Sequence, residues 1–148
     1  MDELRGHYIE DMTVGMTAVF SKTITDADVA MFAGVSGDTN PLHLDSDFAS
    51  SSVFGGRVAH GMLSASLLST IFGTKLPGPG CIYLSQSLRF RAPVRVGDTV
   101  VARATVEKID GERGRATFSC TCTVGDTMVI DGEALVLVPS RKAGEVNA

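Results

Sequence analysis

The sequence has no tryptophan, only two tyrosines and only three cysteines among its 148 residues. An odd number of cysteines, none of them in a C-x-x-C pair, argues against a disulfide framework and against a zinc site. We expect Cys81, Cys120 and Cys122 to be small buried hydrophobic residues, with Cys120 and Cys122 on one face of a strand.

Long hydrophobic runs are also missing, since none approaches the roughly 18 residues of a membrane-spanning helix. Residues 1–12, MDELRGHYIEDM, are acidic and polar and resemble neither a secretory signal nor an arginine-rich transit peptide. We therefore expect a cytoplasmic protein that does not bind membranes.

Basic residues are few, with 13 Lys and Arg against 17 Asp and Glu and a net charge of −4. This balance argues against general nucleic-acid binding, which depends on neutralising phosphates. One stretch is locally basic and could meet a smaller anionic ligand, and it contains Arg89, Arg91, Arg95 and Arg103.

The chain length suits one domain, and a composition of 44% hydrophobic and 20% charged residues is typical of a globular one. No internal repeat or linker divides the sequence. We predict a single domain over residues 1–148, with a core over about residues 13–139 and a polar tail over 140–148.

The first half predicts one strand followed by helices. Residues 16–23 have strand character, and Thr25 with Asp28 forms a capping-box-like helix start. Gly34 and Gly37 should break that helix and open a loop, after which Asp45 could cap a short second helix. The segment from residue 60 to residue 72 is apolar nearly all round, which indicates a buried helix, ended by Gly73 and the glycines and prolines of 77–80.

The second half predicts strands over residues 82–91, 99–109, 115–124 and 127–138, where β-branched residues and alternation dominate. Asp110-Gly111 and Gly125-Asp126 supply short turns, which imply antiparallel neighbours. One buried helix with a long antiparallel sheet makes an α+β domain whose sheet wraps the helix. This is the hot-dog arrangement.

The segment SGDTNPLH, residues 36–43, is the first candidate for chemistry. Pro41 fixes its own φ and pushes Asn40 into an extended conformation, so Asp38 and His43 can point at one spot. A carboxylate and an imidazole that share a water molecule form a general acid/base device. The plain alternative is that Asp38 caps a turn and His43 begins the next element.

The second candidate is Gly61, which stands at the start of the buried helix in the segment RVAHGML, residues 57–63. The first amides of a helix lack intrahelical partners and carry the positive end of its dipole. Glycine lets a ligand atom approach them closely, which would create an oxyanion hole for a carbonyl that gains negative charge. Taken alone, a glycine at a helix start is weak evidence.

Together these segments resemble the MaoC-like hydratases, and in particular the bacterial (R)-specific enoyl-CoA hydratases that supply polyhydroxyalkanoate synthesis. The resemblance covers about residues 13–139 and rests on SGDTNPLHLD, GRVAHGMLSASL, LPGPGCIYLSQSLRFRAPVRVGD and DGEALVLVP. It implies a single hot-dog fold, a homodimer and acyl-thioester substrates. No cofactor is implied, because coenzyme A is part of the substrate, and no metal is expected, because the helix terminus activates the thioester.

By the same resemblance, Asp38 and His43 are the catalytic pair and the Gly61 N–H polarises the thioester carbonyl. The residues implied in substrate binding are Asn40, His60, Met62, Ser69, Arg89 and Arg91. Several of them have plainer alternatives. Ser69 could bond back to its own helix turn, His60 could be structural or orienting, and the two arginines could lie on a solvated strand face rather than on the phosphates of coenzyme A.

The implied reaction is reversible syn hydration of a trans-2-enoyl-CoA to an (R)-3-hydroxyacyl-CoA. Three alternatives stay open: a MaoC-like dehydratase of a branched or carboxylated acyl-CoA, a hot-dog acyl-CoA thioesterase, and a non-catalytic subunit that binds acyl thioesters. Release of free thiol would identify the thioesterase, and binding without turnover would identify the binding subunit.

Overall fold

The computed structural model describes residues 2–142. Six strands and four α-helices follow two short 3₁₀ turns. In chain order the elements are η1 (Asp2–Leu4), η2 (Ile9–Asp11), β1 (Thr17–Thr23), α1 (Asp26–Ser36), α2 (Pro41–Leu44), α3 (Ser46–Ser50), α4 (Gly61–Thr74), β2 (Ile82–Gln86), β3 (Arg89–Phe90), β4 (Thr99–Asp110), β5 (Arg115–Val124) and β6 (Thr127–Leu137).

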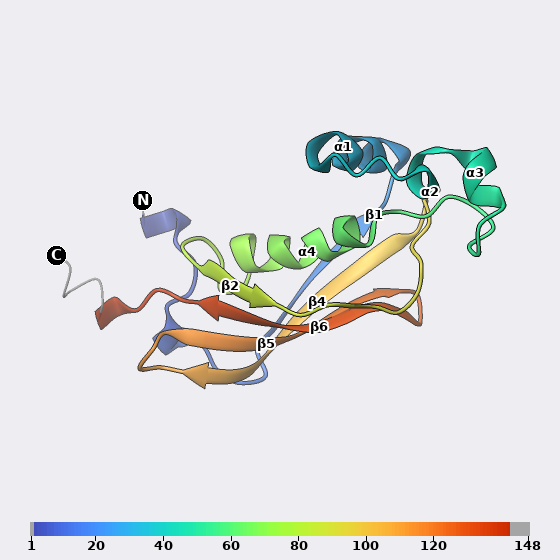
Figure 1. Cartoon of the computed structure of the whole chain (residues 1–148). Helices are drawn as coiled ribbons and strands as arrows, with labels where there is room; N and C mark the ends of the chain where they lie inside the picture. The colour runs from blue at the N-terminus through green and yellow to red at the C-terminus, as the bar shows by residue number, and fades with distance from the viewer. Residues whose placement is uncertain (1, 143–148) are drawn as a thin grey trace.

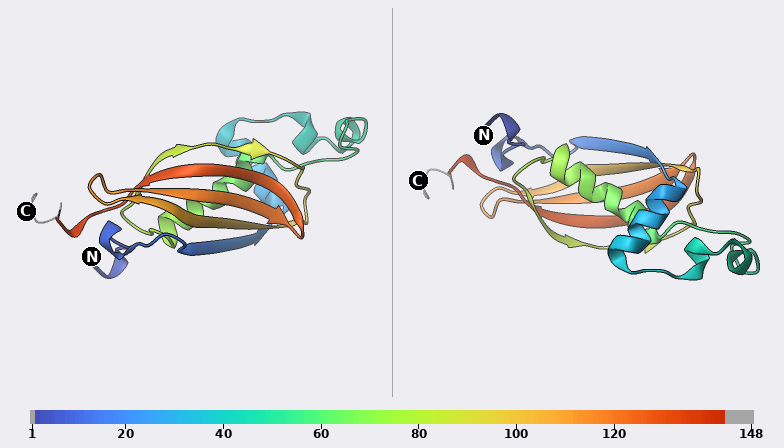
Figure 2. Two further views of the ribbon diagram at one scale, coloured as in Figure 1. Left: turned by 90° about the horizontal axis from the view of Figure 1, so that it is seen from below. Right: turned by 90° about the horizontal axis from the view of Figure 1, so that it is seen from above.

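The strands form one antiparallel sheet in the order β1-β4-β5-β6-β2, and β3 also pairs with β6. The sheet curves around α4, which lies along its inner face (Figure 1). Helices α1, α2 and α3 gather beyond the N-terminal end of α4, as the two further views also show (Figure 2). The expected α+β hot-dog fold is therefore confirmed.

The core lies between α4 and the sheet, and the sequence pattern of both elements explains it. Strands β4 and β5 alternate buried and less buried residues along most of their length, as expected for strands with one face on a core. Leu68, Ile71 and Phe72 of α4 are at most 1% exposed. The Phe72 ring packs on Phe118 of β5, with the ring centroids 4.9 Å apart.

Helix α1 begins as predicted, with Thr25 and Asp28 in a reciprocal capping box. Its end differs from the prediction, because Gly34 lies inside the helix and only Gly37 terminates it. Gly37 adopts a left-handed conformation with φ of 79°, which glycine accepts without a steric penalty. At Gly34 the helix simply continues, since a helical glycine costs only about 1 kcal/mol.

The strand predicted over residues 82–91 is interrupted, and it is two strands, β2 and β3. At the break the Ser87 amide donates to the Glu133 carbonyl at 2.9 Å, and the Glu133 amide donates to Ser87 Oγ at 3.0 Å. The Ser87 carbonyl oxygen fills the space where a side chain at Gly132 would stand. The two strands therefore meet β6 on either side of this close approach.

Two further boundaries differ from the prediction. Helix α4 runs through Gly73 to Thr74, and the connection between β4 and β5 spans residues 111–114 rather than the dipeptide Asp110-Gly111. The two-residue turn Gly125-Asp126 between β5 and β6 is confirmed.

The prediction of buried cysteines is confirmed for Cys120 and Cys122 but not for Cys81. Cys120 and Cys122 are free thiols on β5 with no exposed surface, and Cys81 is free and partly buried. Burial raises the pKa of Cys120 to about 11 and that of Cys122 to about 12. Neither thiol is poised as a nucleophile, since a reactive cysteine needs a lowered pKa.

None of the helices in the described part of the chain is long and apolar enough to cross a membrane. The predicted polar tail over 140–148 lies largely outside the described residues, which end at residue 142.

Candidate active site

The segment between β1 and α4 brings the predicted site residues together at the N-terminal end of α4. Asp38 lies in the loop after α1, His43 lies in α2, and His60 is the N-cap residue of α4. One possible ligand atom from each of these side chains lies within 4.8 Å of the others. The carboxylate and the imidazole of the sequence motif therefore do converge.

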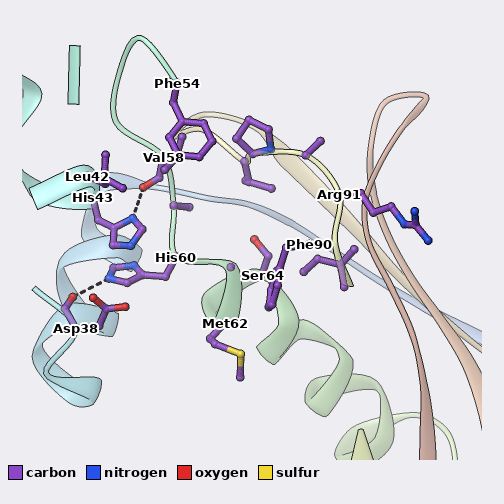
Figure 3. Close-up of a pocket in the computed structure, with 16 residues that line it drawn as sticks. Asp38, Leu42, His43, Phe54, Val58, His60, Met62, Ser64, Phe90 and Arg91 are labelled. Carbon is purple, nitrogen blue, oxygen red and sulfur yellow. Dashed lines mark hydrogen bonds between the residues drawn. The ribbon is translucent and has the colours of Figure 1, made fainter. Parts of the chain in front are cut away.

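Asp38 is fixed at three points by its neighbours. Its amide donates to Ser36 Oγ at 3.1 Å, and its Oδ1 accepts the Asn40 amide at 3.2 Å. Its backbone carbonyl accepts His60 Nε2 at 2.9 Å. These contacts hold the loop and leave the exposed carboxylate directed toward the two imidazoles (Figure 3).

His43 was predicted in a loop, but it lies in the short helix α2. Pro41 occupies the first helical position, where its missing N–H costs nothing, and Asn40 Oδ1 caps the helix by accepting the Leu42 amide at 3.0 Å. His43 Nδ1 lies 2.7 Å from the Val58 carbonyl oxygen. A carbonyl only accepts, so Nδ1 carries the proton and Nε2 is left for chemistry.

His60 is 2% exposed and packs between two rings. Its ring centroid lies 3.8 Å from that of His43 and 4.8 Å from that of Phe32. Because its Nε2 donates to the Asp38 carbonyl and its ring packs on His43, His60 links the backbone of Asp38 to the ring of His43. This placement supports the orienting role that the sequence left open.

Asp38, His43 and His60 form the one group of three potential metal ligands within residues 2–142. Each histidine already uses one ring nitrogen on a backbone carbonyl, which leaves one nitrogen each. One carboxylate and two free ring nitrogens could serve in acid/base chemistry or bind a cation. The expected absence of a metal therefore stays a prediction.

Gly61 is the first residue of α4, so its amide has no intrahelical acceptor. A Cβ at this position would lie 2.6 Å from the Phe90 ring, closer than any stable contact. Gly61 has a negative φ, so the need for glycine comes from space and not from the backbone conformation. Glycine at this position therefore lets the Phe90 ring pack directly against the start of α4.

A cavity of about 480 Å³ opens at this point, between the end of α4 and the chain around β3 (Figure 3). Its walls are mainly apolar, with the polar groups gathered at the end of α4. The residues that line it are Asp38, Leu42, His43, Phe54, Val58, Ala59, His60, Gly61, Met62, Ser64, Phe90, Arg91, Ala92, Pro93, Val94 and Ile130.

Six of the nine predicted site residues line this cavity, and three do not. Asn40 caps α2, as described above, and Arg89 is exposed on β3. Ser69 lies in a second groove along α4 and β2, together with Met62, which borders both spaces. Met62 and Ser69 are seven residues apart and so share one face of α4.

Arg91 lines the cavity but is already paired. Its Nη2 lies 2.8 Å from Asp131 Oδ2, and its Nε donates to the same oxygen at 2.9 Å. The pair is partly exposed, so the guanidinium retains donors that face solvent.

Several lining residues were not identified from the sequence, including Phe54, Phe90 and Ile130. These come from a loop, a two-residue strand and β6, and no local pattern joins them. Ser64 did carry a signal, because it is a polar residue on the buried face of an apolar helix, where it is 1% exposed.

Comparison with known proteins agrees with this arrangement. The family model described as "MaoC like domain" matches residues 11–128. The chain is 53% identical to an (R)-specific enoyl-CoA hydratase of Rhodospirillum rubrum over 140 residues, which are 95% of this chain and 97% of that protein. It is 50% identical to a 3-hydroxybutyryl-CoA dehydratase of Methylorubrum extorquens over 145 residues, which are 98% and 92% of the two chains.

Solved structures agree as well. The (R)-hydratase of Aeromonas caviae involved in polyhydroxyalkanoate biosynthesis superposes with a TM-score of 0.85 at 44% identity, covering 88% of this chain and 99% of that one. An R-hydratase of Pseudomonas aeruginosa gives a TM-score of 0.86 at 38% identity, covering 92% and 88%. With the family model, the close relatives and the shared fold in agreement, the chain belongs to the MaoC-like dehydratase family.

Proposed function

We propose that this chain is an (R)-specific enoyl-CoA hydratase, a hydro-lyase that also acts in reverse as a 3-hydroxyacyl-CoA dehydratase. The observation that carries the proposal is the convergence of Asp38 and His43 beside the open N-terminus of α4. The identity to hydratases and dehydratases of acyl-CoA thioesters, at about half of all positions over nearly the full chain, supports it.

In the proposed mechanism one water molecule supplies both groups that add to the double bond. Asp38 accepts a proton from the water as the water oxygen bonds to C3. His43, which carries protons on both ring nitrogens at this step, keeps Nδ1–H on the Val58 carbonyl and delivers the proton of Nε2 to C2. Both groups reach the substrate from the same side, which gives syn addition. A proton transfer from Asp38 to Nε2 of His43 then restores the starting state.

Negative charge develops on the thioester oxygen as C3 is attacked, and the Gly61 amide is the donor assigned to it. This amide is at the positive end of α4 and needs no reorganisation during the reaction. The acid/base pair and the helix terminus therefore act on opposite ends of the same conjugated system.

For substrate contacts, we assign Met62 and His60 to the walls beside the reacting atoms. Arg91 is assigned to the phosphates of coenzyme A, with Arg89 next to it on β3. Ser69 and Asn40 are assigned to the edge of the site, since neither lines the main cavity. Short to medium unbranched acyl chains are the expected substrates.

The test is hydration of crotonyl-CoA, followed as loss of the enoyl-thioester absorbance, with Asp38→Asn measured beside the wild type. We expect an (R)-3-hydroxy product, no free thiol, and a loss of about 10²–10⁴-fold in the variant. Free thiol would indicate a thioesterase instead. Binding of crotonyl-CoA without turnover would indicate a binding subunit, and turnover retained by Asp38→Asn would refute the acid/base assignment.

Removal of metal provides a second test. Dialysis of the wild type against EDTA should leave the rate of hydration unchanged, because the helix terminus rather than a cation polarises the carbonyl. Loss of activity that Zn²⁺ or Mg²⁺ restores would mean that Asp38, His43 and His60 hold a cation.

We further propose that the chain forms a homodimer through the edge of the sheet at β2. Strand β2 is the last in the sheet order, and it exposes Ile82 (56%) and Leu84 (41%). An edge strand with exposed apolar side chains is a site where another chain adds. Light scattering should give twice the 15.5 kDa chain mass, and Leu84→Lys should lower it. A wild-type monomer would contradict the proposal.

A further inference from the structure

Ser64 stands out among the hydroxyl groups of the helices. Ser36, Ser66 and Thr74 each donate to a carbonyl three or four residues back, all at 2.6 Å, which is the usual arrangement for a helical hydroxyl. Ser64 Oγ makes no such bond and has no hydrogen-bond partner among the described residues, although Ser64 is only 1% exposed. A buried hydroxyl without a partner is destabilising, because it has lost its bonds to water and gained none in return.

Ser64 lies close to Gly61 on α4 and borders the cavity of the candidate site. It lies three residues after Gly61, so the two share one face of α4, and the Cα–Cβ bonds of a helix tilt toward its N-terminus. Both residues line the same cavity, and the hydroxyl of Ser64 projects from α4 toward it (Figure 3). Gly61 and Ser64 therefore border the same cavity from the first turns of α4, at the positive end of the helix.

The backbone around Ser64 is fixed on two sides, which sets the point from which its side chain leaves the helix. The Ser64 amide donates to the His60 carbonyl, and its own carbonyl accepts a weak bond from Cys122 Sγ at 3.9 Å. Ser64 thus sits between the N-cap residue of α4 and strand β5. A donor held in this way is organised before the substrate arrives, which is the property that makes an oxyanion hole effective.

From this geometry we propose that Ser64 Oγ is a second donor of the oxyanion hole and acts with the Gly61 amide on the thioester oxygen. The inference rests on the proposed hydratase function and adds a residue to it. As negative charge builds on that oxygen, the hydroxyl donates its hydrogen bond and gains the partner it lacks in the free enzyme. No proton is transferred by Ser64, so the balance of the reaction is unchanged.

The proposal predicts opposite effects on stability and on catalysis. Ser64→Ala removes an unpartnered buried hydroxyl, so its Tm should equal or exceed that of the wild type. Its kcat for crotonyl-CoA hydration should fall at least about tenfold, with KM within about threefold. A purely structural serine would give the reverse, with a lowered Tm and a normal kcat.

A ligand that mimics the charged state gives a readout that does not depend on turnover. Acetoacetyl-CoA ionises to an enolate whose near-ultraviolet band can be titrated on the enzyme. With both donors present, the bound ligand should ionise at lower pH than it does on Ser64→Ala. Ser64→Cys, which keeps a weak donor, should lie between the two. Thr74→Ala, which removes a back-bonded hydroxyl at the far end of α4, should match the wild type in every measurement.

The outcomes separate the two proposals. If the wild type hydrates crotonyl-CoA and Ser64→Ala does so at the same rate, or if the enolate titration does not move, the Ser64 proposal is overturned while the hydratase function stands. If the wild type does not hydrate any enoyl-CoA, the function itself fails. Should Ser64→Ala not fold, Ser64→Cys decides, and an unchanged enolate titration in that variant counts against the proposal.

Discussion

The imidazole rings of His43 and His60 lie 3.8 Å apart, centroid to centroid, with their planes inclined by 31°. His60 also donates from Nε2 to the carbonyl of Asp38. One buried residue therefore contacts both members of the proposed acid/base pair, the ring of His43 and the backbone of Asp38.

Replacing His60 should consequently lower turnover through geometry. We expect His60→Ala to reduce kcat by about 10- to 100-fold, since a displacement of about 1 Å of a reacting group can cost 10²-fold. The pH profile of kcat should keep its shape, because Asp38 and His43 are still present. Steady-state kinetics across pH would check this, and a profile that lost one limb would instead make His60 a proton-transfer group.

A side chain at position 61 should interfere with the site more than with the fold. The Cβ of Gly61→Ala would meet the Phe90 ring at 2.6 Å, and Phe90, which is 55% exposed, has room to turn aside. We expect a Tm within a few degrees of the wild type and a loss of at least about tenfold in kcat/KM.

The variant Phe90→Ala separates the two possible causes. If Gly61→Ala lowers kcat/KM because it displaces Phe90, then Phe90→Ala alone should lower kcat/KM by the same factor. If Phe90→Ala stays active while the double variant Gly61→Ala/Phe90→Ala is as slow as Gly61→Ala, the methyl group blocks the amide itself. Normal kinetics in Gly61→Ala would remove Gly61 from the oxyanion hole.

Gly132 should be sensitive for a purely structural reason. The Ser87 carbonyl oxygen occupies the place of its missing side chain, and this oxygen belongs to the backbone, which cannot rotate away. We expect Gly132→Ala to destabilise the protein by about 1–3 kcal/mol and to lower Tm by several degrees. Thermal unfolding measures this loss of stability. Gly125→Asn is the control, because Gly125 lies in an open left-handed turn, and its Tm should fall less.

Stability should fall at alkaline pH because of the buried thiols. Burial raises the pKa of Cys122 from 9.0 to about 12, so above pH 9 the unfolded thiol ionises while the folded one stays protonated. Ionisation lowers the free energy of the unfolded state but not that of the folded state. The thiol's contribution to stability is therefore lost as the pH rises from about 9 toward 12.

Urea unfolding at pH 8 and pH 10 tests this. Between pH 8 and pH 10 the free energy of unfolding of Cys122→Ala should fall by about 1.4 kcal/mol less than that of the wild type. One thiol contributes about this much per pH unit above its unfolded pKa of 9.0, and only one unit of the interval lies above that value. The cost of the smaller side chain is the same at both pH values and cancels. Equal losses in the two proteins would show that Cys122 ionises as readily in the folded chain as in the unfolded one.

Local rules were enough to predict most elements. The Thr25–Asp28 capping box, the Gly125-Asp126 turn and the alternating strands β4 to β6 depend on residues close together in sequence. The one break in a predicted strand has its cause far along the chain. The break between β2 and β3 depends on Gly132, which lies more than 40 positions beyond Ser87 in the sequence, and no pattern within residues 82–91 reveals it.

The candidate site shows the same division. The motif identified Asp38 and His43, but their orientation depends on Val58 and His60, which approach only after α1, α2 and α4 have packed. Ser69 was grouped with the catalytic pair by resemblance. It lies eight residues after Gly61, which turns it by about 80° around the helix axis, and this places it in the neighbouring groove.

The origin of the cavity walls has a consequence for the choice of acyl group. Each side chain assigned to proton transfer comes from the stretch between α1 and the start of α4, whereas Phe90, Pro93 and Ile130 come from the sheet and the segment after β3. The sheet side of the cavity carries none of the groups assigned to proton transfer. Substitutions at Phe90, Pro93 or Ile130 should therefore change which acyl group is accepted while Asp38 and His43 stay in place.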